Sequence, residues 1–159
     1  MKKLARVPPE RRVYIDEMGI VVFLIRLFAY ALIGKRVHAK VRGRRHDRLN
    51  VIGALWNGRH VGVECYRHAT NSAFFEEWFK RLLSKIPRGC TVIMDNASFH
   101  RKKALRKLSR GRCRLLFLPP YSPDLNPIEH SWANVKRHLR NYLRDDQTLE
   151  NAIHEYFNV

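Results

Sequence analysis

Alternating hydrophobic and polar positions along the first half of the chain predict a series of short β-strands. Residues 11–16 alternate around Val13 and Ile15, and Gly19 then breaks the pattern. Two apolar runs flank Asn57-Gly58, a dipeptide typical of tight β-hairpin turns. The strand-like segments are 11–16, 20–30, 35–41, 49–56 and 60–66. We expect the second and third of these to form a hairpin with the first.

The second half of the chain alternates between helical and strand-like patterns. Thr70 or Asn71 can cap a helix that runs to about Lys85, with large apolar residues on one broad face, and Pro87 ends it. The later elements are expected as a strand at 90–94, a basic helix at 98–108, a strand at 115–118, a helix from 127 and a last helix within 145–159. This order predicts an α/β fold in which helices flank a mixed sheet.

The loop between the strand at 115–118 and the next helix is unusually rigid, because three prolines occupy it before residue 124. Asn126 suits the N-cap, and Pro127 suits the first helical position. Glu129 then lies in the first turn, beside a buried stripe of Ile128, Trp132, Val135 and Leu139. Asn-x-x-Glu is also a capping box, in which the glutamate only returns to the cap's backbone N–H. Both interpretations of Glu129 remain open on this pattern alone.

Three carboxylates are expected to meet at one end of the sheet. Asp16 and Asp95 each end a predicted strand, and Glu129 lies at the helix start that reaches the same edge. Either aspartate alone has an ordinary explanation as a turn or capping residue. Together they form a set of hard oxygen donors suited to Mg²⁺ or Mn²⁺, and two such ions promote phosphodiester cleavage.

The charge of the chain favours a polyanionic partner. Its 159 residues carry 31 Lys and Arg against 14 Asp and Glu, a formal net charge of +17. The basic residues follow the chain in polar or amphipathic segments without an obvious lipid-facing side, so nucleic acid is a better partner than a membrane. Residues 20–33 are unusually apolar, but they are shorter than the roughly 20 residues that a membrane span needs. Arg26 also stands in their middle.

The cysteines and the first residues predict a cytoplasmic protein. Cys65, Cys90 and Cys113 are odd in number and widely spaced, which indicates neither a disulfide framework nor a zinc site. The opening MKKLARVPPERR lacks the apolar core of a secretory leader. The length suits a single domain over residues 1–159.

Three blocks, YIDEMG, IMDNASFH and LPPYSPDLNPIEHSWANVKRHL, resemble in that order the catalytic blocks of the DDE transposases of bacterial insertion sequences. The resemblance is closest to the insertion-sequence-630 family, which is related to mariner elements. It implies a ribonuclease-H-like fold and a metal-binding catalytic triad of Asp16, Asp95 and Glu129. Asp124 is a neighbouring acid, but the family motif places its acid in NPIE.

The resemblance implies a catalytic domain that cleaves and joins DNA strands in transposition with Mg²⁺ or Mn²⁺, acting on DNA as a homo-oligomer. Such proteins usually carry an amino-terminal helix-turn-helix region, which is expected to be absent here. The alternatives are a truncated transposase fragment that binds DNA without cutting it, and a ribonuclease-H-like nuclease.

Candidate DNA contacts follow the third block and the basic helix. They are His100, Lys102, Lys103, Arg106 and Lys136. A basic run is often only a solvated surface, and His100 at a helix start has the same simple interpretation. Trp132 is at a core position of its stripe rather than on a base-stacking surface.

Overall fold

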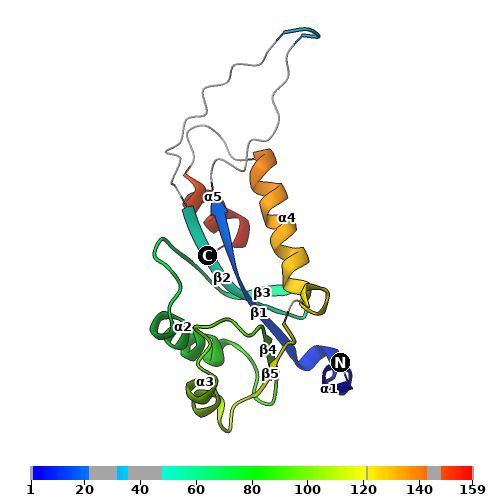
Figure 1. Ribbon diagram of the computed structural model, residues 1–159, viewed down its shortest axis with the longest axis vertical. Coiled ribbons are helices and arrows are strands. Elements are labelled where there is room, and N and C mark those ends of the chain that lie inside the picture. The colour runs from blue at the N-terminus through cyan, green and yellow to red at the C-terminus, as the bar shows by residue number, and fades with distance from the viewer. Residues whose placement is uncertain (1, 22–31, 36–47, 121, 143–147, 159) are drawn as a thin grey trace.

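A five-stranded mixed sheet organises the fold, in the order β3-β2-β1-β4-β5 (Figure 1). The computed structural model describes residues 2–21, 32–35, 48–120, 122–142 and 148–158. The strands are β1 (Arg12–Val21), β2 (Arg48–Trp56), β3 (Arg59–Tyr66), β4 (Thr91–Met94) and β5 (Arg114–Phe117). β1, β2 and β3 pair antiparallel, whereas β4 and β5 run parallel to β1. The predicted mixed sheet is thereby confirmed.

Helices cover both faces of this sheet. The helical elements are α1 (Lys2–Ala5), η1 (Pro9–Arg11), α2 (Ser72–Lys85), α3 (Lys102–Ser109), η3 (Pro123–Leu125), α4 (Pro127–Tyr142) and α5 (Leu149–Phe157). One apolar cluster joins Val13 and Ile15 of β1 to Phe75, Trp78 and Phe79 of α2. A second cluster joins the other face of the sheet to the predicted stripe of α4 and to α5. The sheet is therefore the middle layer of a three-layer sandwich.

Local signals in the sequence placed several elements correctly. Asn57 and Gly58 both adopt positive φ, 49° and 75°, as a tight hairpin turn between β2 and β3 requires. Asn71 caps α2 with its side chain, which accepts a hydrogen bond from the backbone N–H of Phe74 at 2.9 Å. Arg112 satisfies the other end of that helix, because its guanidinium donates to the carbonyls of Leu83 and Ile86.

β1 is longer than its sequence pattern predicted. The strand continues through Gly19 to Val21, because β2 pairs with it from Val13–Trp56 to Val21–Arg48. Asp16 therefore lies inside a strand, opposite Gly53, and not at a strand end as expected. The parallel pairing with β4, in contrast, stops at Tyr14–Ile93. Asp16 thus lies just beyond the point at which β1 and β4 separate.

α3 is shorter than predicted, and begins at Lys102 instead of near Ser98. Residues 95–101 form tight turns: the N–H of Ala97 donates to Asp95 Oδ1, and the N–H of His100 donates to the Ala97 carbonyl. The hairpin expected over 20–30 and 35–41 falls almost wholly outside the described residues. None of the helices in the described ranges is long and apolar enough to cross a membrane.

The start of α4 differs from the expected side-chain cap. Asn126 precedes the helix, and its backbone carbonyl accepts from the N–H of Glu129 at 3.0 Å. Its side chain is buried, however, and among the described residues Oδ1 has no hydrogen-bond partner. The backbone turn and Pro127 therefore begin this helix, and the amide of Asn126 contributes no cap.

Candidate active site

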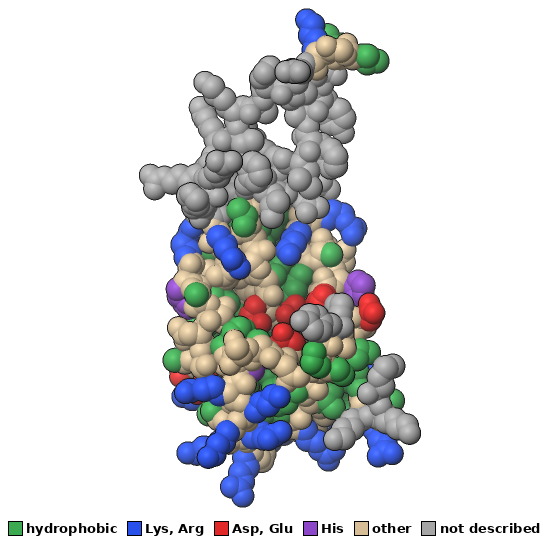
Figure 2. All heavy atoms as spheres, viewed as in Figure 1, with side chains coloured by type: hydrophobic (Ala, Val, Ile, Leu, Met, Phe, Trp, Pro, Cys, Tyr) green, Lys and Arg blue, Asp and Glu red, His purple; other side chains and the backbone are tan. Residues whose placement is uncertain are grey.

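The three predicted acids come from three different elements, and Asp95 and Glu129 lie near enough to Asp16 to affect its pKa. Asp16 lies in β1, Asp95 directly follows β4, and Glu129 lies in the first turn of α4. Figure 2 shows Asp and Glu side chains gathered in the middle of one face of the molecule, with Lys and Arg side chains above and below them. In a chain of net charge +17, these acidic side chains thus lie between two groups of basic side chains on this face.

Asp16 is the most perturbed of these carboxyl groups. Its burial, followed by the charges of Glu17, Glu129 and Asp95, raises the pKa of Asp16 to about 7. Among the described residues, no Lys or Arg is among the groups that shift this pKa. The acids are thus close enough together to act on one another electrostatically.

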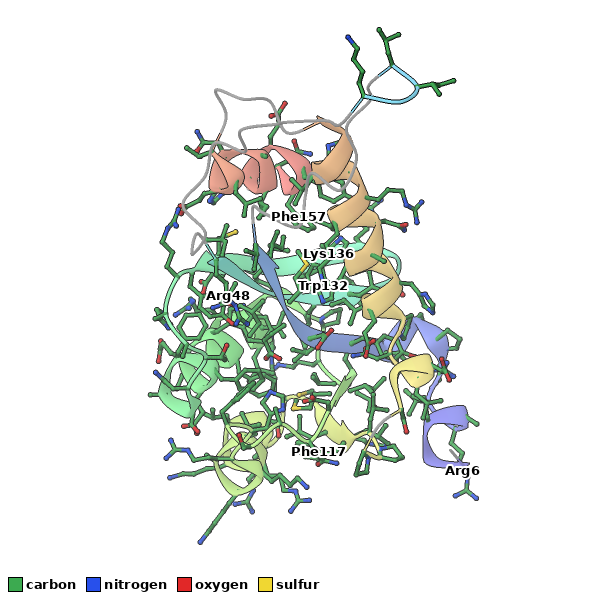
Figure 3. The ribbon with its side chains drawn as sticks, turned by 45° about the horizontal axis from the view of Figure 1, so that its top comes forward. Arg6, Arg48, Phe117, Trp132, Lys136 and Phe157 are labelled. Carbon is green, nitrogen blue, oxygen red and sulfur yellow. The ribbon has the colours of Figure 1, made fainter. Side chains whose placement is uncertain are left out.

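The packing of Trp132 determines how closely α4, and with it Glu129, approaches Asp16. Figure 3 shows Trp132 reaching from α4 toward the sheet, where it lies over Gly53, the β2 partner of Asp16. A Cβ added at Gly53 would lie 3.0 Å from Trp132 Cη2 and 3.3 Å from Val63 Cγ2. Gly53 therefore permits a close helix–sheet approach. Trp132 is 3% exposed, as its core position in the stripe predicted.

Asp95 is held from two sides. Its Oδ1 accepts the N–H of Ala97 at 3.0 Å and lies 3.1 Å from His100 Nδ1. The hydrogen bond from His100 lowers the pKa of Asp95 below its usual value. Next to it, Asn96 donates from Nδ2 to the Leu118 carbonyl at 2.6 Å, which ties the end of β4 to the chain after β5.

His100 occupies a buried position that the sequence did not suggest. Its side chain is only 2% exposed, because Phe75 and Phe99 pack on its ring. The surface position that a DNA contact requires is therefore not available to it. Burial alone would lower the pKa of His100, but Asp95 and Glu17 outweigh that effect and raise the pKa to about 9.

Glu17 belongs to this site and was missed in the sequence. Its Oε1 lies 3.5 Å from His100 Nε2. Successive residues of a strand point to opposite faces of the sheet, so Glu17 points away from its neighbour Asp16 and toward the α2–α3 side. The DE pair at 16–17 and the histidine five residues after Asp95 were the available signals.

Glu129 is exposed, and its side chain makes no hydrogen bond to any other residue in the part of the chain that the structure describes. The reciprocal contact of a capping box is therefore absent from α4. The neighbouring Asp124 is also exposed, in η3, and is not among the charges that raise the pKa of Asp16. Asp124 is accordingly the poorer candidate for the acidic site.

The donor chemistry of this site suits a hard divalent cation. Carboxylate oxygens are the preferred ligands of Mg²⁺ and Mn²⁺, and a cation would relieve the repulsion around Asp16. Within the described residues, no three His, Cys, Asp or Glu side chains are grouped so that they could hold a metal ion as they stand. The residues present therefore suit a divalent metal ion by the type and charge of their donor atoms.

The raised pKa of Asp16 predicts a dependence of stability on pH in metal-free protein. Because this pKa is higher in the folded chain than its ordinary value of 3.8, folding is favoured at low pH and loses that contribution as the pH rises through about 7. Asp16→Asn should therefore be more stable than the parent at pH 8, by about 2–4 kcal/mol, and should equal it near pH 4. Urea unfolding in EDTA at both pH values measures this difference. A variant that is less stable than the parent at pH 8 would contradict it.

The predicted DNA contacts outside the acidic site lie on two helices. Lys102, Lys103 and Arg106 are exposed on α3, and Lys102 Nζ lies 5.0 Å from the centre of the Phe117 ring. Lys136 is half-buried on α4, about two turns beyond Glu129 (Figure 3). In the described part of the chain, Lys103 and Arg106 form no ion pair, so their charges are available to a polyanion.

A protein-family model described as DDE superfamily endonuclease matches residues 11–150. The chain belongs to this family. The match confirms the resemblance to DDE enzymes and spans all three acids.

Two curated relatives connect this DDE endonuclease domain to Tc1/mariner transposases. The transposable element Tcb2 transposase of Caenorhabditis briggsae is 43% identical over 58 residues, which are 36% of this chain and 21% of the relative. The Tc1 transposase of Caenorhabditis elegans is 40% identical over 58 residues, also 21% of its length.

Solved structures show the same fold for the DDE domain. The Mos1 transposase paired-end complex with left transposon end has a TM-score of 0.73 at 20% identity, over 99% of this chain and 51% of that one. The HTLV-2 integrase catalytic core domain in complex with magnesium has a TM-score of 0.58 at 15% identity, over 95% of this chain and 85% of that one. The expected ribonuclease-H-like fold is confirmed. The chain spans about half of the Mos1 transposase chain (51%).

Proposed function

We propose that this chain is the catalytic domain of a transposase of the insertion-sequence-630 family, and that it cleaves and joins DNA strands with Mg²⁺ or Mn²⁺. The observation that carries the proposal is that Asp95 and Glu129 both help to raise the pKa of Asp16, in a chain of the DDE family. Mos1 transposase complexes with transposon DNA, with Mn and with Mg are among the similar structures, and support both the partner and the metal.

The three carboxylates have distinct structural tasks in this proposal. Asp16 projects from β1 where it pairs with β2, Asp95 from a turn held by Ala97 and His100, and Glu129 from the start of a long helix. Together they would hold the divalent ions, which when bound stabilise the negative charge that develops on the phosphate. The rigid elements that carry these side chains keep the carboxylates in place as that charge develops.

The proposed reaction has two stages at one site. Cleavage adds water across a P–O bond and leaves a 3′-hydroxyl and a 5′-phosphate. In joining, that 3′-hydroxyl loses its proton and attacks a phosphodiester of a second strand. A new P–O bond forms as the bond between that phosphorus and the target strand's 3′-oxygen breaks, and the released 3′-oxygen takes up a proton. The positive surfaces on both sides of the acids would bind the phosphate backbones and place them over the carboxylates.

Nicking of supercoiled plasmid in Mg²⁺, with EDTA as the control, tests the proposal. Mg²⁺-dependent conversion to open circles supports a cutting enzyme, whereas binding without nicking would favour a DNA-binding transposase fragment. Transfer of a labelled 3′-hydroxyl strand into plasmid separates a transposase from a ribonuclease-H-like nuclease, which should cut hybrids or branched DNA without joining strands.

We further propose that residues 1–159 act as a single catalytic domain in the cytoplasm and as a homo-oligomer on DNA. The presence of Cys65, Cys90 and Cys113 as free thiols supports a reducing compartment. Sizing of the protein–DNA complex by light scattering tests the oligomer.

The charge distribution predicts weakly selective DNA binding that is steeply dependent on salt. Phosphate neutralisation by the α3 cations releases counterions, so affinity should fall by about 10³-fold or more between 50 and 200 mM salt if six or more phosphates are contacted. Fluorescence anisotropy with two unrelated DNA sequences measures both properties. Lys103→Ala should reduce the salt slope by about one unit for each sequence alike. Affinity that is insensitive to salt and strongly selective for one sequence would contradict this prediction.

A further inference from the structure

The backbone does not by itself fix the distance between Asp16 and Asp95. β1 and β4 are paired in parallel from Arg12–Thr91 only as far as Tyr14–Ile93. Beyond this point β1 continues along β2, whereas the chain after Met94 turns into a loop. The two aspartates thus follow immediately after the shared ladder ends. Some other contact must connect the two segments if the acids are to keep a fixed separation.

His100 is placed to make that connection. Its Nδ1 lies 3.1 Å from Asp95 Oδ1 and 3.2 Å from the Asp95 carbonyl oxygen. On the other side of the ring, Nε2 lies 3.5 Å from Oε1 of Glu17, the residue next to Asp16. One imidazole therefore spans from the loop after β4 to β1. Among the described residues neither Glu17 Oε1 nor His100 Nε2, both fully buried, forms a hydrogen bond, so the 3.5 Å contact between them is the polar interaction available to each.

The ring of His100 is itself fixed in place. The centre of the Phe75 ring lies 4.2 Å from that of His100, and the Phe99 ring lies edge-on at 4.6 Å. Phe75 is fully buried within the α2 cluster. The backbone N–H of His100 also bonds the Ala97 carbonyl, in the same turn in which the Ala97 N–H bonds Asp95. Because the core fixes the position of the His100 ring, the ring can in turn fix the position of the Asp95 carboxylate that it contacts.

We propose that His100, anchored on β1 by Glu17, is a positioning residue that holds Asp95 at a fixed place relative to Asp16. The inference rests on the proposed function, because it takes these aspartates as the metal-holding pair. It assigns roles to two residues outside the triad. His100 acts through Asp95, and Glu17 acts through His100. Residues that orient metal ligands in this way typically change metal affinity by about 10–100-fold when altered.

Mn²⁺ affinity without DNA tests this inference, measured from the electron paramagnetic resonance signal of free Mn²⁺. His100→Phe keeps a ring between Phe75 and Phe99 and removes both polar contacts, and it should weaken Mn²⁺ binding by about 10-fold or more. His100→Asn places an amide nitrogen near the position of Nδ1, and should keep more of the affinity. The matched control is His68→Phe, because exposed His68 also packs on aromatic rings, those of Tyr66 and Phe74, and should bind Mn²⁺ as the parent does.

Glu17→Gln distinguishes a positioning chain from simple packing. If Glu17 acts through His100, the Glu17→Gln substitution should weaken Mn²⁺ binding in the parent. In the His100→Phe background the same substitution should cause little further loss. Additive losses, or unchanged affinity in His100→Phe and Glu17→Gln while Asp95→Asn abolishes binding, would overturn the inference alone. A parent chain that binds no Mn²⁺, or an Asp95→Asn variant that binds it like the parent, would overturn the proposed function and the inference with it.

Discussion

Asp95→Asn is expected to abolish Mg²⁺-dependent nicking of supercoiled plasmid, with a loss of about 10²–10³-fold or more. Removing one carboxylate charge removes affinity for the divalent ions, whose stabilisation of phosphate charge contributes several kcal/mol. The fold should survive, because the asparagine Oδ1 can still accept from the Ala97 N–H and from His100. Initial nicking rates and thermal unfolding of the same preparations measure the two effects separately.

The matched control for this prediction is Asp124→Asn. It removes the same charge from an exposed acid that lies near the site in sequence but does not act on Asp16. It should nick DNA like the parent. Undiminished nicking by Asp95→Asn, or an equal loss in Asp124→Asn, would remove Asp95 from the triad.

Glu129→Gln is expected to lose nicking to a similar extent while its free energy of unfolding stays within about 1 kcal/mol of the parent. The structure sharpens this prediction, because among the described residues the Glu129 side chain takes no part in capping α4. Neither the start of the helix nor the core loses a contact in the variant. Only the charge facing Asp16 disappears.

His130→Gln, one residue later and also exposed, is the control for an unspecific effect at the helix start. It should melt and cut like the parent. A Glu129→Gln protein that cuts at the parent rate would leave Glu129 outside the catalytic set, and would favour the interpretation of the chain as a DNA-binding fragment.

Local patterns predicted those elements whose cause is local. The Asn57-Gly58 turn, the Asn71 cap of α2 and the apolar stripe of α4 each depend on residues within a few positions of one another. The extent of β1 does not depend on local residues alone. In isolation Gly19 is typical of a strand break, but β2 pairs with β1 from Val13 to Val21, so the strand continues past Gly19. Tertiary pairing here overrides a local preference.

Only the part of the site that depends on local sequence was predictable. Asp16, Asp95 and Glu129 could be picked out because each stands in a recognisable block of sequence. The burial of His100 and its contact with Glu17 depend on how α2 packs under the loop after β4, and no single segment encodes that packing. Burial also explains why, among the described residues, Oδ1 of Asn126 has no hydrogen-bond partner, although the sequence suggests that Asn126 caps α4.

The wide separation of the three acids along the chain also sets an order of events during folding. β1 must wait for β4, synthesised much later, and loop-closure entropy makes such long-range pairing slow compared with the β2–β3 hairpin or the helices. The basic residues of α3, in contrast, carry their charge in any conformation. In the proposed transposase, a nascent or partly folded chain would therefore bind nucleic acid before its carboxylates come together, so DNA binding would precede cleavage.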